Sequence, residues 1–88
     1  MKPELYILKL SNGQYYVGST LNIERRIYQH NNGQVKSTKG KVPAKIVFRK
    51  SFATLKQARQ VEYKLKSYKN KKIIQQIIKD QKINFMGA

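Results

Sequence analysis

The sequence predicts an α+β fold in which a small three-stranded antiparallel sheet is flanked by helices. Three observations support this. Two short β-type runs, residues 5–10 and 14–17, are separated by turn residues. Two later segments carry apolar residues at three- and four-residue spacings, which is typical of amphipathic helices. A third β-rich run lies between the helical patterns. The element order is therefore β-β-α-β-α-α, in one domain spanning residues 1–88.

The first two strands form a predicted hairpin. Residues 5–10 are almost continuously apolar, which indicates a strand buried on both faces of the sheet. A two-residue loop would place Tyr6 and Tyr16 on opposite faces. A three-residue loop ending at a left-handed Gly13 pairs Tyr6 with Gly18 and places both tyrosines on one face. We predict the three-residue loop because glycine suits its third position.

A helix is expected over about residues 21–31, with Ser19, Thr20 and Asn22 as candidate N-caps. Its expected packing residues are Leu21, Ile23, Ile27 and Tyr28. Residues 31–33, Asn-Asn-Gly, end it. Arg26 and His30 are four residues apart, so they share one face of this helix.

The second half of the chain predicts a loop, a strand and two helices. Residues 34–43 are a polar loop in which Lys36, Lys39 and Lys41 could contact phosphate, although a solvated loop explains them equally well. Residues 44–52 read as the third strand. Thr54 with Gln57 forms a capping box for a helix to about residue 67. A last helix contains residues 73–78, after a junction at 69–72, and we expect residues 83–88 to be loosely held.

The charge predicts an anionic partner. The chain has 19 Lys and Arg against 4 Asp and Glu, a formal charge of +15. Such a field attracts polyanions, and nucleic acid is the leading candidate, with Lys66 and Lys69 as further expected contacts. A basic ribosomal or structural protein is a competing interpretation. The absence of cysteine excludes disulfide partners. The absence of a long apolar run or signal peptide predicts no membrane association and a cytoplasmic protein.

Glu62 is the only acidic residue between Glu24 and Asp80. It could form an ion pair with Lys66 one helical turn later, and judged alone this is the simpler interpretation. It also lies beside the apolar stripe of its helix, at the edge of the buried face. A carboxylate there, in a strongly positive surround, could hold a hard divalent cation.

Several of these residues together resemble the GIY-YIG endonuclease domain over essentially the whole chain. The matching segments are Leu5-Tyr6-Ile7, Tyr16-Val17-Gly18, Arg26-x-x-x-His30 and Glu62. The likeness is closest to the stand-alone, single-domain branch similar to the excision-nuclease catalytic module. Leu5 replaces the glycine of the first motif, and Val17 replaces the isoleucine of the second. Asn70 is a candidate for an asparagine found near the end of some members.

The resemblance implies an endonuclease that hydrolyses DNA phosphodiester bonds with one Mg²⁺ or Mn²⁺ ion held by Glu62. It implies catalytic roles for Tyr6, Tyr16, Arg26 and His30, and a structural role for Gly18. Arg26 has the fork geometry for phosphate oxygens. A tyrosine serving as base must be acidified by its neighbours. Either tyrosine could be that base, and we favour Tyr6.

The alternative function is a nucleic-acid-binding module that cleaves little alone and binds through its lysines. The DNA could be branched or single-stranded, and repair, recombination and mobile-element processing are all compatible settings. The sequence leaves the oligomeric state open.

Overall fold

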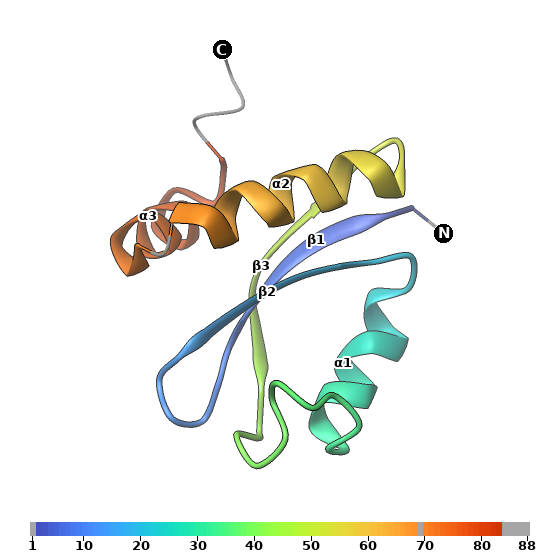
Figure 1. Ribbon diagram of the computed structural model, residues 1–88, viewed down its shortest axis with the longest axis vertical. Helices are drawn as coiled ribbons and strands as arrows, with labels where there is room; N and C mark the ends of the chain where they lie inside the picture. Colours follow the sequence, from blue (N-terminus) through green and yellow to red (C-terminus); the bar gives the residue numbers. More distant parts are fainter. Residues whose placement is uncertain (1, 69, 84–88) are drawn as a thin grey trace.

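The computed structural model describes residues 2–68 and 70–83, and it confirms the predicted order β-β-α-β-α-α (Figure 1). The elements are β1 (Glu4–Lys9), β2 (Tyr15–Thr20), α1 (Ile23–Asn31), β3 (Lys45–Ser51), α2 (Leu55–Tyr68) and α3 (Lys71–Asp80). Within the described residues, no helix has the length and apolar character needed to cross a membrane.

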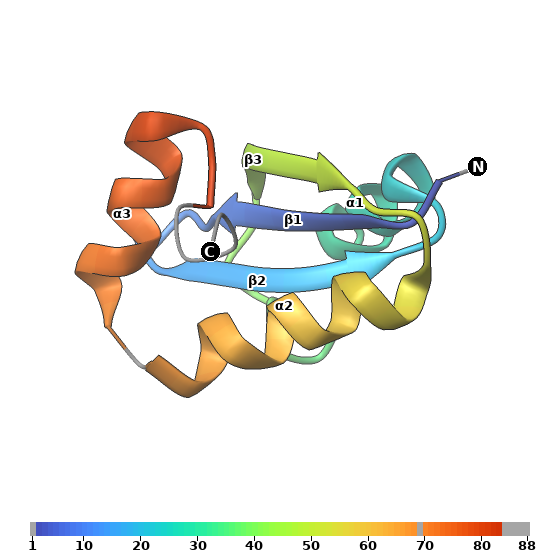
Figure 2. The same cartoon turned by 90° about the horizontal axis from the view of Figure 1, so that it is seen from above.

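The three strands form one antiparallel sheet in the order β2-β1-β3 (Figure 2). The central strand β1 is covered on both faces, as its apolar sequence predicts, and Leu5, Tyr6, Ile7 and Leu8 are all buried. Strand β2 is an edge strand, and α2 runs alongside it. Side chains on β2 can therefore reach the helices on either side of the sheet.

The hairpin between β1 and β2 has the predicted three-residue loop. Gly13 is left-handed with φ 86°, and Tyr6 pairs with Gly18 across the two strands. Leu8 pairs with Tyr16, so both tyrosines and Gly18 face the same side of the sheet. This register brings the predicted site residues of the hairpin together.

Strand β2 is longer than expected, which corrects the prediction for Ser19 and Thr20. Ser19 pairs with Leu5 and Thr20 pairs with Glu4, so both belong to the sheet. The N-cap of α1 is Asn22, whose side chain accepts a hydrogen bond from the backbone N–H of Arg25 at 3.1 Å. Pairing with β1 therefore outweighs the capping preference of serine and threonine here.

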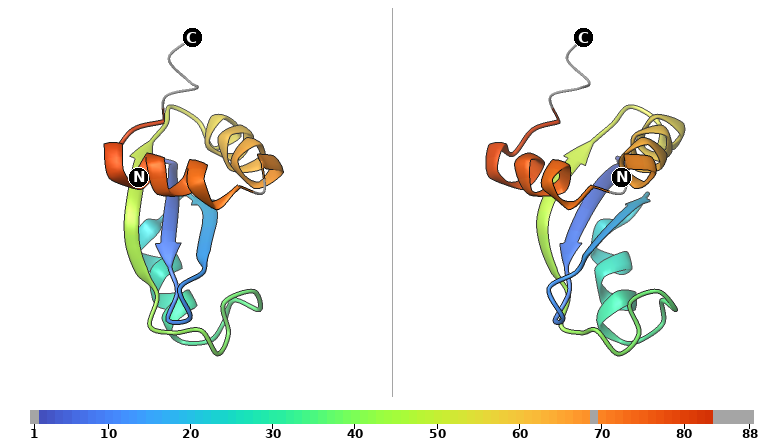
Figure 3. Two further views of the ribbon diagram at one scale, coloured as in Figure 1. Left: turned by 90° about the vertical axis from the view of Figure 1, so that its left-hand side faces the viewer. Right: turned by 60° about the vertical axis from the view of Figure 1, so that its left-hand side comes forward.

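Helices cover both faces of the sheet (Figures 1 and 3), and each face carries its own apolar cluster. Helices α2 and α3 pack on the face that carries Leu5, Ile7, Val17 and Phe48. Helix α1 packs on the face that carries Tyr6 and Leu8. The loop between α1 and β3 lies at the hairpin end of the sheet (Figure 3).

Three expectations about packing are wrong. Leu21 is 53% exposed and Tyr28 is 63% exposed, because only the stripe containing Ile23 and Ile27 faces the sheet. Ile83 is 7% exposed and packs with α2 and α3, so it is not loosely held as expected. Residues 84–88 lie outside the described residues.

The two later helices begin at polar caps. Thr54 and Gln57 form the predicted capping box, with reciprocal bonds of 3.1 and 3.3 Å. Helix α3 starts at Lys71, earlier than expected, because the side chain of Asn70 accepts a hydrogen bond from the N–H of Lys72. Asn70 is therefore engaged as a helix cap.

Candidate active site

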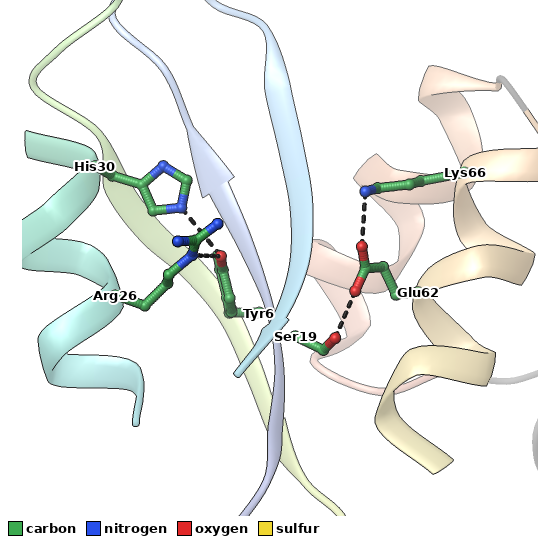
Figure 4. Close-up of polar contacts among 6 residues, drawn as sticks. All are labelled: Tyr6, Ser19, Arg26, His30, Glu62 and Lys66. Carbon is green, nitrogen blue, oxygen red and sulfur yellow. Dashed lines mark hydrogen bonds and ion pairs between the residues drawn. The ribbon is translucent and has the colours of Figure 1, made fainter. Parts of the chain in front are cut away.

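The hydroxyl of Tyr6 lies at the centre of a buried polar cluster (Figure 4). Tyr6 is on β1 and is 1% exposed. Its oxygen is 3.0 Å from Nε2 of His30 and accepts a hydrogen bond from Nε of Arg26 at 3.4 Å. Both partners lie on α1, one turn apart, as their spacing predicts. The structure thus joins three of the four residues predicted to be catalytic.

The loop after α1 fixes the orientation and tautomer of His30. Nδ1 of this fully buried ring lies 2.8 Å from Oγ1 of Thr38, which is also fully buried. The Thr38 hydroxyl donates to the carbonyl of Val35, so it accepts from Nδ1–H of His30. Nε2 is then an acceptor, and Tyr6 donates its hydroxyl proton to it. Local sequence patterns do not indicate Thr38 as a partner of His30, because the contact is made across a loop.

The electrostatics of the cluster keep both rings neutral. Burial, followed by the nearby Arg26 charge, lowers the pKa of His30 to about 4. Burial raises the pKa of Tyr6 to about 12, although the hydrogen bond from Arg26 opposes this rise. The pKa of Arg26 is raised, mainly by its bond to Tyr6. The acidified tyrosine expected from the sequence is therefore not the resting state: desolvation outweighs the adjacent guanidinium.

Gly18 is required by the Tyr6 hydroxyl. A Cβ atom added to this extended residue would lie 2.4 Å from the Tyr6 oxygen and 2.5 Å from the ring carbon that carries it. The hydroxyl therefore packs directly against bare backbone of β2. The structural role predicted for Gly18 has a steric cause here, and its backbone conformation is one that any residue could adopt.

Tyr16 borders the cluster on the same face of the sheet. Its ring centroid is 6.3 Å from that of Tyr6 and 4.8 Å from that of His30, which it meets edge-on. Tyr16 is partly exposed, unlike Tyr6. The ammonium of Lys66 lies 5.5 Å from the Tyr16 ring centroid. Tyr16 therefore connects the buried cluster to the α2 side of the site.

Glu62 lies on α2, and strand β2 passes between it and the Arg26 cluster in the close-up (Figure 4). Its two oxygens are both engaged, one by the Ser19 hydroxyl at 2.5 Å and the other by the Lys66 ammonium at 2.7 Å. The ion pair with Lys66 is the simpler of the two interpretations considered for this residue. The carboxylate is still near enough to Tyr6 to contribute to its raised pKa.

The described residues contain no group of three or more His, Cys, Asp or Glu side chains that could together hold a metal ion. A divalent ion at Glu62 would have one protein carboxylate. Mg²⁺ accepts this, because it retains several waters and takes further oxygens from substrate phosphate. The side chain of Glu62 is 22% exposed, so an ion could reach it once Lys66 releases one oxygen.

A depression between the start of α1 and the start of α2 collects arginines. Arg26 lines it together with Arg25 and Arg59, and none of its described lining residues is acidic. Its hydroxyl and amide groups come from Ser19, Thr20, Asn22 and Gln29. Neither Arg25 nor Arg59 is among the site residues predicted from the sequence. The position of Arg59, one turn before Glu62 on the same helix, was the available signal.

The predicted DNA-contacting lysines are spread over two regions. Lys36 and Lys39 are exposed on the loop after α1. Lys41 and Lys66 line a second groove beside β2. Lys69 lies outside the described residues.

Comparisons with known proteins agree on one family. The model of the GIY-YIG catalytic domain matches residues 2–75. A UPF0213 protein of Staphylococcus saprophyticus is 39% identical over 72 residues, which cover 81% of this chain and 88% of that protein. A UPF0213 protein of Photorhabdus laumondii is 44% identical over 63 residues, 70% of this chain and 61% of that protein. The solution structure of a UPF0213 protein from Bacillus halodurans has a TM-score of 0.56 at 32% identity, and covers 88% of this chain and 83% of that one.

Proposed function

The chain belongs to the GIY-YIG catalytic-domain family, a nuclease family, and from this premise we propose that it is a metal-dependent endonuclease that hydrolyses DNA phosphodiester bonds. The observation that carries the proposal is the buried hydrogen-bond chain from Arg26 through Tyr6 and His30 to Thr38. Burying polar groups is costly unless all are paired, and apolar side chains would pack this region more simply. The chain of bonds is suited to moving a proton.

Tyr6 is the proposed general base, and it acts as a relay. The attacking water gives a proton to the Tyr6 oxygen while Tyr6 passes its own proton to Nε2 of His30. A new P–O bond forms to the water oxygen as the scissile P–O ester bond breaks. This relay needs no preformed phenolate, so it is compatible with a Tyr6 pKa of about 12. Thr38 holds the imidazolium that results through its bond to Nδ1–H.

Tyr16 is the alternative base, because it is partly exposed and contacts His30 edge-on. The two candidates are separated by comparing Tyr6→Phe with Tyr16→Phe. Each change removes one hydroxyl and retains the ring. The larger loss of cleavage rate identifies the base, since general-base catalysis contributes about 10²–10⁴-fold.

Arg26 is proposed to stabilise charge on the scissile phosphate. Its Nε is bonded to Tyr6 and its Nη1 donates to Gln29, which fixes the plane of the guanidinium. The depression that it shares with Arg25 and Arg59 supplies further positive charge for the developing negative charge. Arg26 therefore contacts the Tyr6 hydroxyl and also lines the depression in which the phosphate is proposed to bind.

Glu62 would hold the single Mg²⁺ or Mn²⁺ ion. Glu62 does not itself line the arginine depression, but Ser19 does, and the Ser19 hydroxyl donates a hydrogen bond to Glu62. When bound, the ion would neutralise negative charge on the phosphate and make departure of the leaving oxygen easier. Ser19 orients one carboxylate oxygen, and Lys66 must release the other.

The test is cleavage of supercoiled, branched and single-stranded DNA in Mg²⁺, in Mn²⁺ and in chelator. We expect cleavage that requires metal and that falls at least about 100-fold in Arg26→Ala and Glu62→Ala while DNA binding remains. Lys79→Ala, an exposed charge on α3, is the control for loss of one positive charge elsewhere. Equal cleavage by Arg26→Ala and the control would refute the assigned roles.

One observation favours a second function, a binding module without cleavage. The Lys66 ammonium occupies an oxygen of Glu62 where an ion would bind. Binding of every DNA tested, with no cleavage in either metal, would support the module. In that case the Arg26 and Glu62 variants would differ from the parent only in affinity.

A further inference from the structure

A second groove runs beside the edge strand β2, on the side where α2 meets α3. Its polar lining includes Tyr15, Tyr16, Lys41, Lys66, Asn70 and Lys71. We propose that this groove binds an unpaired DNA strand, with bases stacked on the two tyrosines and phosphates held by the lysines. The proposal deepens the nuclease function, on which it rests, by naming the substrate as DNA with a single-stranded segment at the cut.

The two tyrosines reach the groove because β2 is an edge strand. Neighbouring residues of a strand point to opposite faces, so Tyr15 faces the α2 and α3 side and Tyr16 faces the α1 side. Both rings are partly exposed and both line the groove. Two aromatic rings on adjacent residues can receive successive bases of one strand.

Each ring has its own cation. The ammonium of Lys71 lies 5.6 Å from the Tyr15 ring centroid, and that of Lys66 lies 5.5 Å from the Tyr16 ring centroid. Each ammonium lies over its ring, so a base that stacks on the tyrosine takes the place of the ammonium on the ring face, and the lysine remains close enough to bind the adjoining phosphate. Lys41 adds a third positive charge from the loop after α1, and none of the described lining residues is acidic.

The mixture of aromatic, apolar and cationic groups favours an unpaired strand over a duplex. Leu10, Val17, Leu65 and Ile74 give the groove apolar surface between its lysines. A duplex presents phosphates to a protein surface and keeps its base faces stacked on one another. An unpaired strand exposes those faces, and aromatic rings beside cations bind them without regard to sequence.

The groove leads to the proposed cleavage site through two shared residues. Tyr16 contacts His30 edge-on, and Lys66 is bonded to Glu62. A strand held along β2 therefore passes next to the groups proposed for hydrolysis. This continuity is why the groove is assigned to the substrate strand.

The test measures binding in chelator, so that cleavage has no influence. Fluorescence anisotropy compares a short oligothymidylate, an abasic chain of the same length and a duplex of the same length. Tyr15→Leu is expected to weaken oligothymidylate binding about tenfold and to leave binding of the abasic chain and the duplex nearly unchanged. Tyr15→Phe retains the ring and is expected to bind like the parent.

Neighbouring lysines on α3 give a matched pair that does not disturb the core. Lys71→Gln and Lys72→Gln remove the same charge from adjacent exposed positions, and only Lys71 lines the groove. Lys71→Gln is expected to weaken oligothymidylate binding severalfold more than Lys72→Gln. Equal losses in the two variants would overturn the proposal.

Two further results would overturn it. One is equal weakening of the abasic chain and the oligothymidylate in Tyr15→Leu. The other is competition by polyglutamate as effective as that by oligothymidylate, which would indicate an acidic peptide as the occupant. These outcomes can be told apart from failure of the proposed function. Metal-dependent cleavage without the binding losses expected for Tyr15→Leu and Lys71→Gln refutes the groove proposal alone. Those binding losses without cleavage of any DNA refute the nuclease proposal alone.

Discussion

Replacing Gly18 with alanine tests whether the Tyr6 hydroxyl must lie against bare backbone. The added Cβ would be 2.4 Å from the Tyr6 oxygen, whereas ordinary van der Waals contact begins at 3.4 Å. The oxygen must therefore move by about 1 Å. The Tyr6 ring is buried at the centre of the sheet and cannot turn aside into solvent. A shift of this size disrupts the hydrogen bond to His30, whose present length is 3.0 Å, because the bond tolerates only a few tenths of an ångström of change.

The expected cost has two parts. Overpacking a core by one methyl group costs about 1–3 kcal/mol, and a buried polar group left unpaired costs about 1–3 kcal/mol. The two costs are not independent, because one movement of the Tyr6 ring changes both. We therefore expect Gly18→Ala to lower the free energy of unfolding by about 2–4 kcal/mol. In a domain of this size that lowers the melting temperature by more than about 8 °C.

The assay combines urea denaturation with single-turnover cleavage under conditions in which the variant is folded. We expect at least about 100-fold slower cleavage, because the proton relay begins at the displaced oxygen. Gly13→Ala is the control: Gly13 has φ 86° and no atoms near its added Cβ, so the change strains the backbone and leaves the site intact. Parental stability and cleavage in Gly18→Ala would refute the steric argument.

Three further predictions concern the charges and bonds around this centre. The fold holds His30, the chain's only histidine, neutral with a pKa of about 4 against an ordinary 6.5, so the unfolded chain binds the extra proton between these values. The free energy of unfolding should be highest above about pH 6.5 and should fall by up to about 1.4 kcal/mol per pH unit towards pH 4. The fall should be less steep in His30→Gln. Urea midpoints of parent and variant that fall in parallel would contradict this. Thr38→Val should abolish the Nδ1–H tautomer of His30, as seen by ¹⁵N NMR, and slow cleavage about tenfold. Thr38→Ser should restore both. An unchanged His30 tautomer in Thr38→Val would contradict the positioning role of Thr38. Lys66→Gln should tighten Mn²⁺ binding severalfold in paramagnetic titrations without DNA, because it frees an oxygen of Glu62, and unaltered binding would argue against that ion site.

The sheet register was predictable because two local rules agree. Gly13 supplies the left-handed residue of a three-residue loop, and alternation then places Tyr6 opposite Gly18. The spacing of Arg26 and His30 similarly predicts one helix face. These are short-range rules that place Tyr6 opposite Gly18 and Arg26 beside His30. The expectation that the two pairs meet in one site comes from the family resemblance.

The contacts that complete the site depend on segments distant in sequence. Ser19 reaches Glu62 across 43 residues, and its place in β2 instead of a helix cap is set by pairing with β1. Thr38 is buried because a polar loop folds back over His30, which no periodicity predicts. Ile83 enters the core only because α3 lies beside the sheet. Tertiary packing, and not local propensity, decides each of these.

The central claim is that the Tyr6 hydroxyl moves the proton of the attacking water. The direct measurement is the single-turnover rate of DNA cleavage in Mg²⁺ by Tyr6→Phe, compared with the parent at saturating protein. A fall of about 10²–10⁴-fold with DNA affinity retained is the predicted result. A rate equal to that of the parent would contradict it.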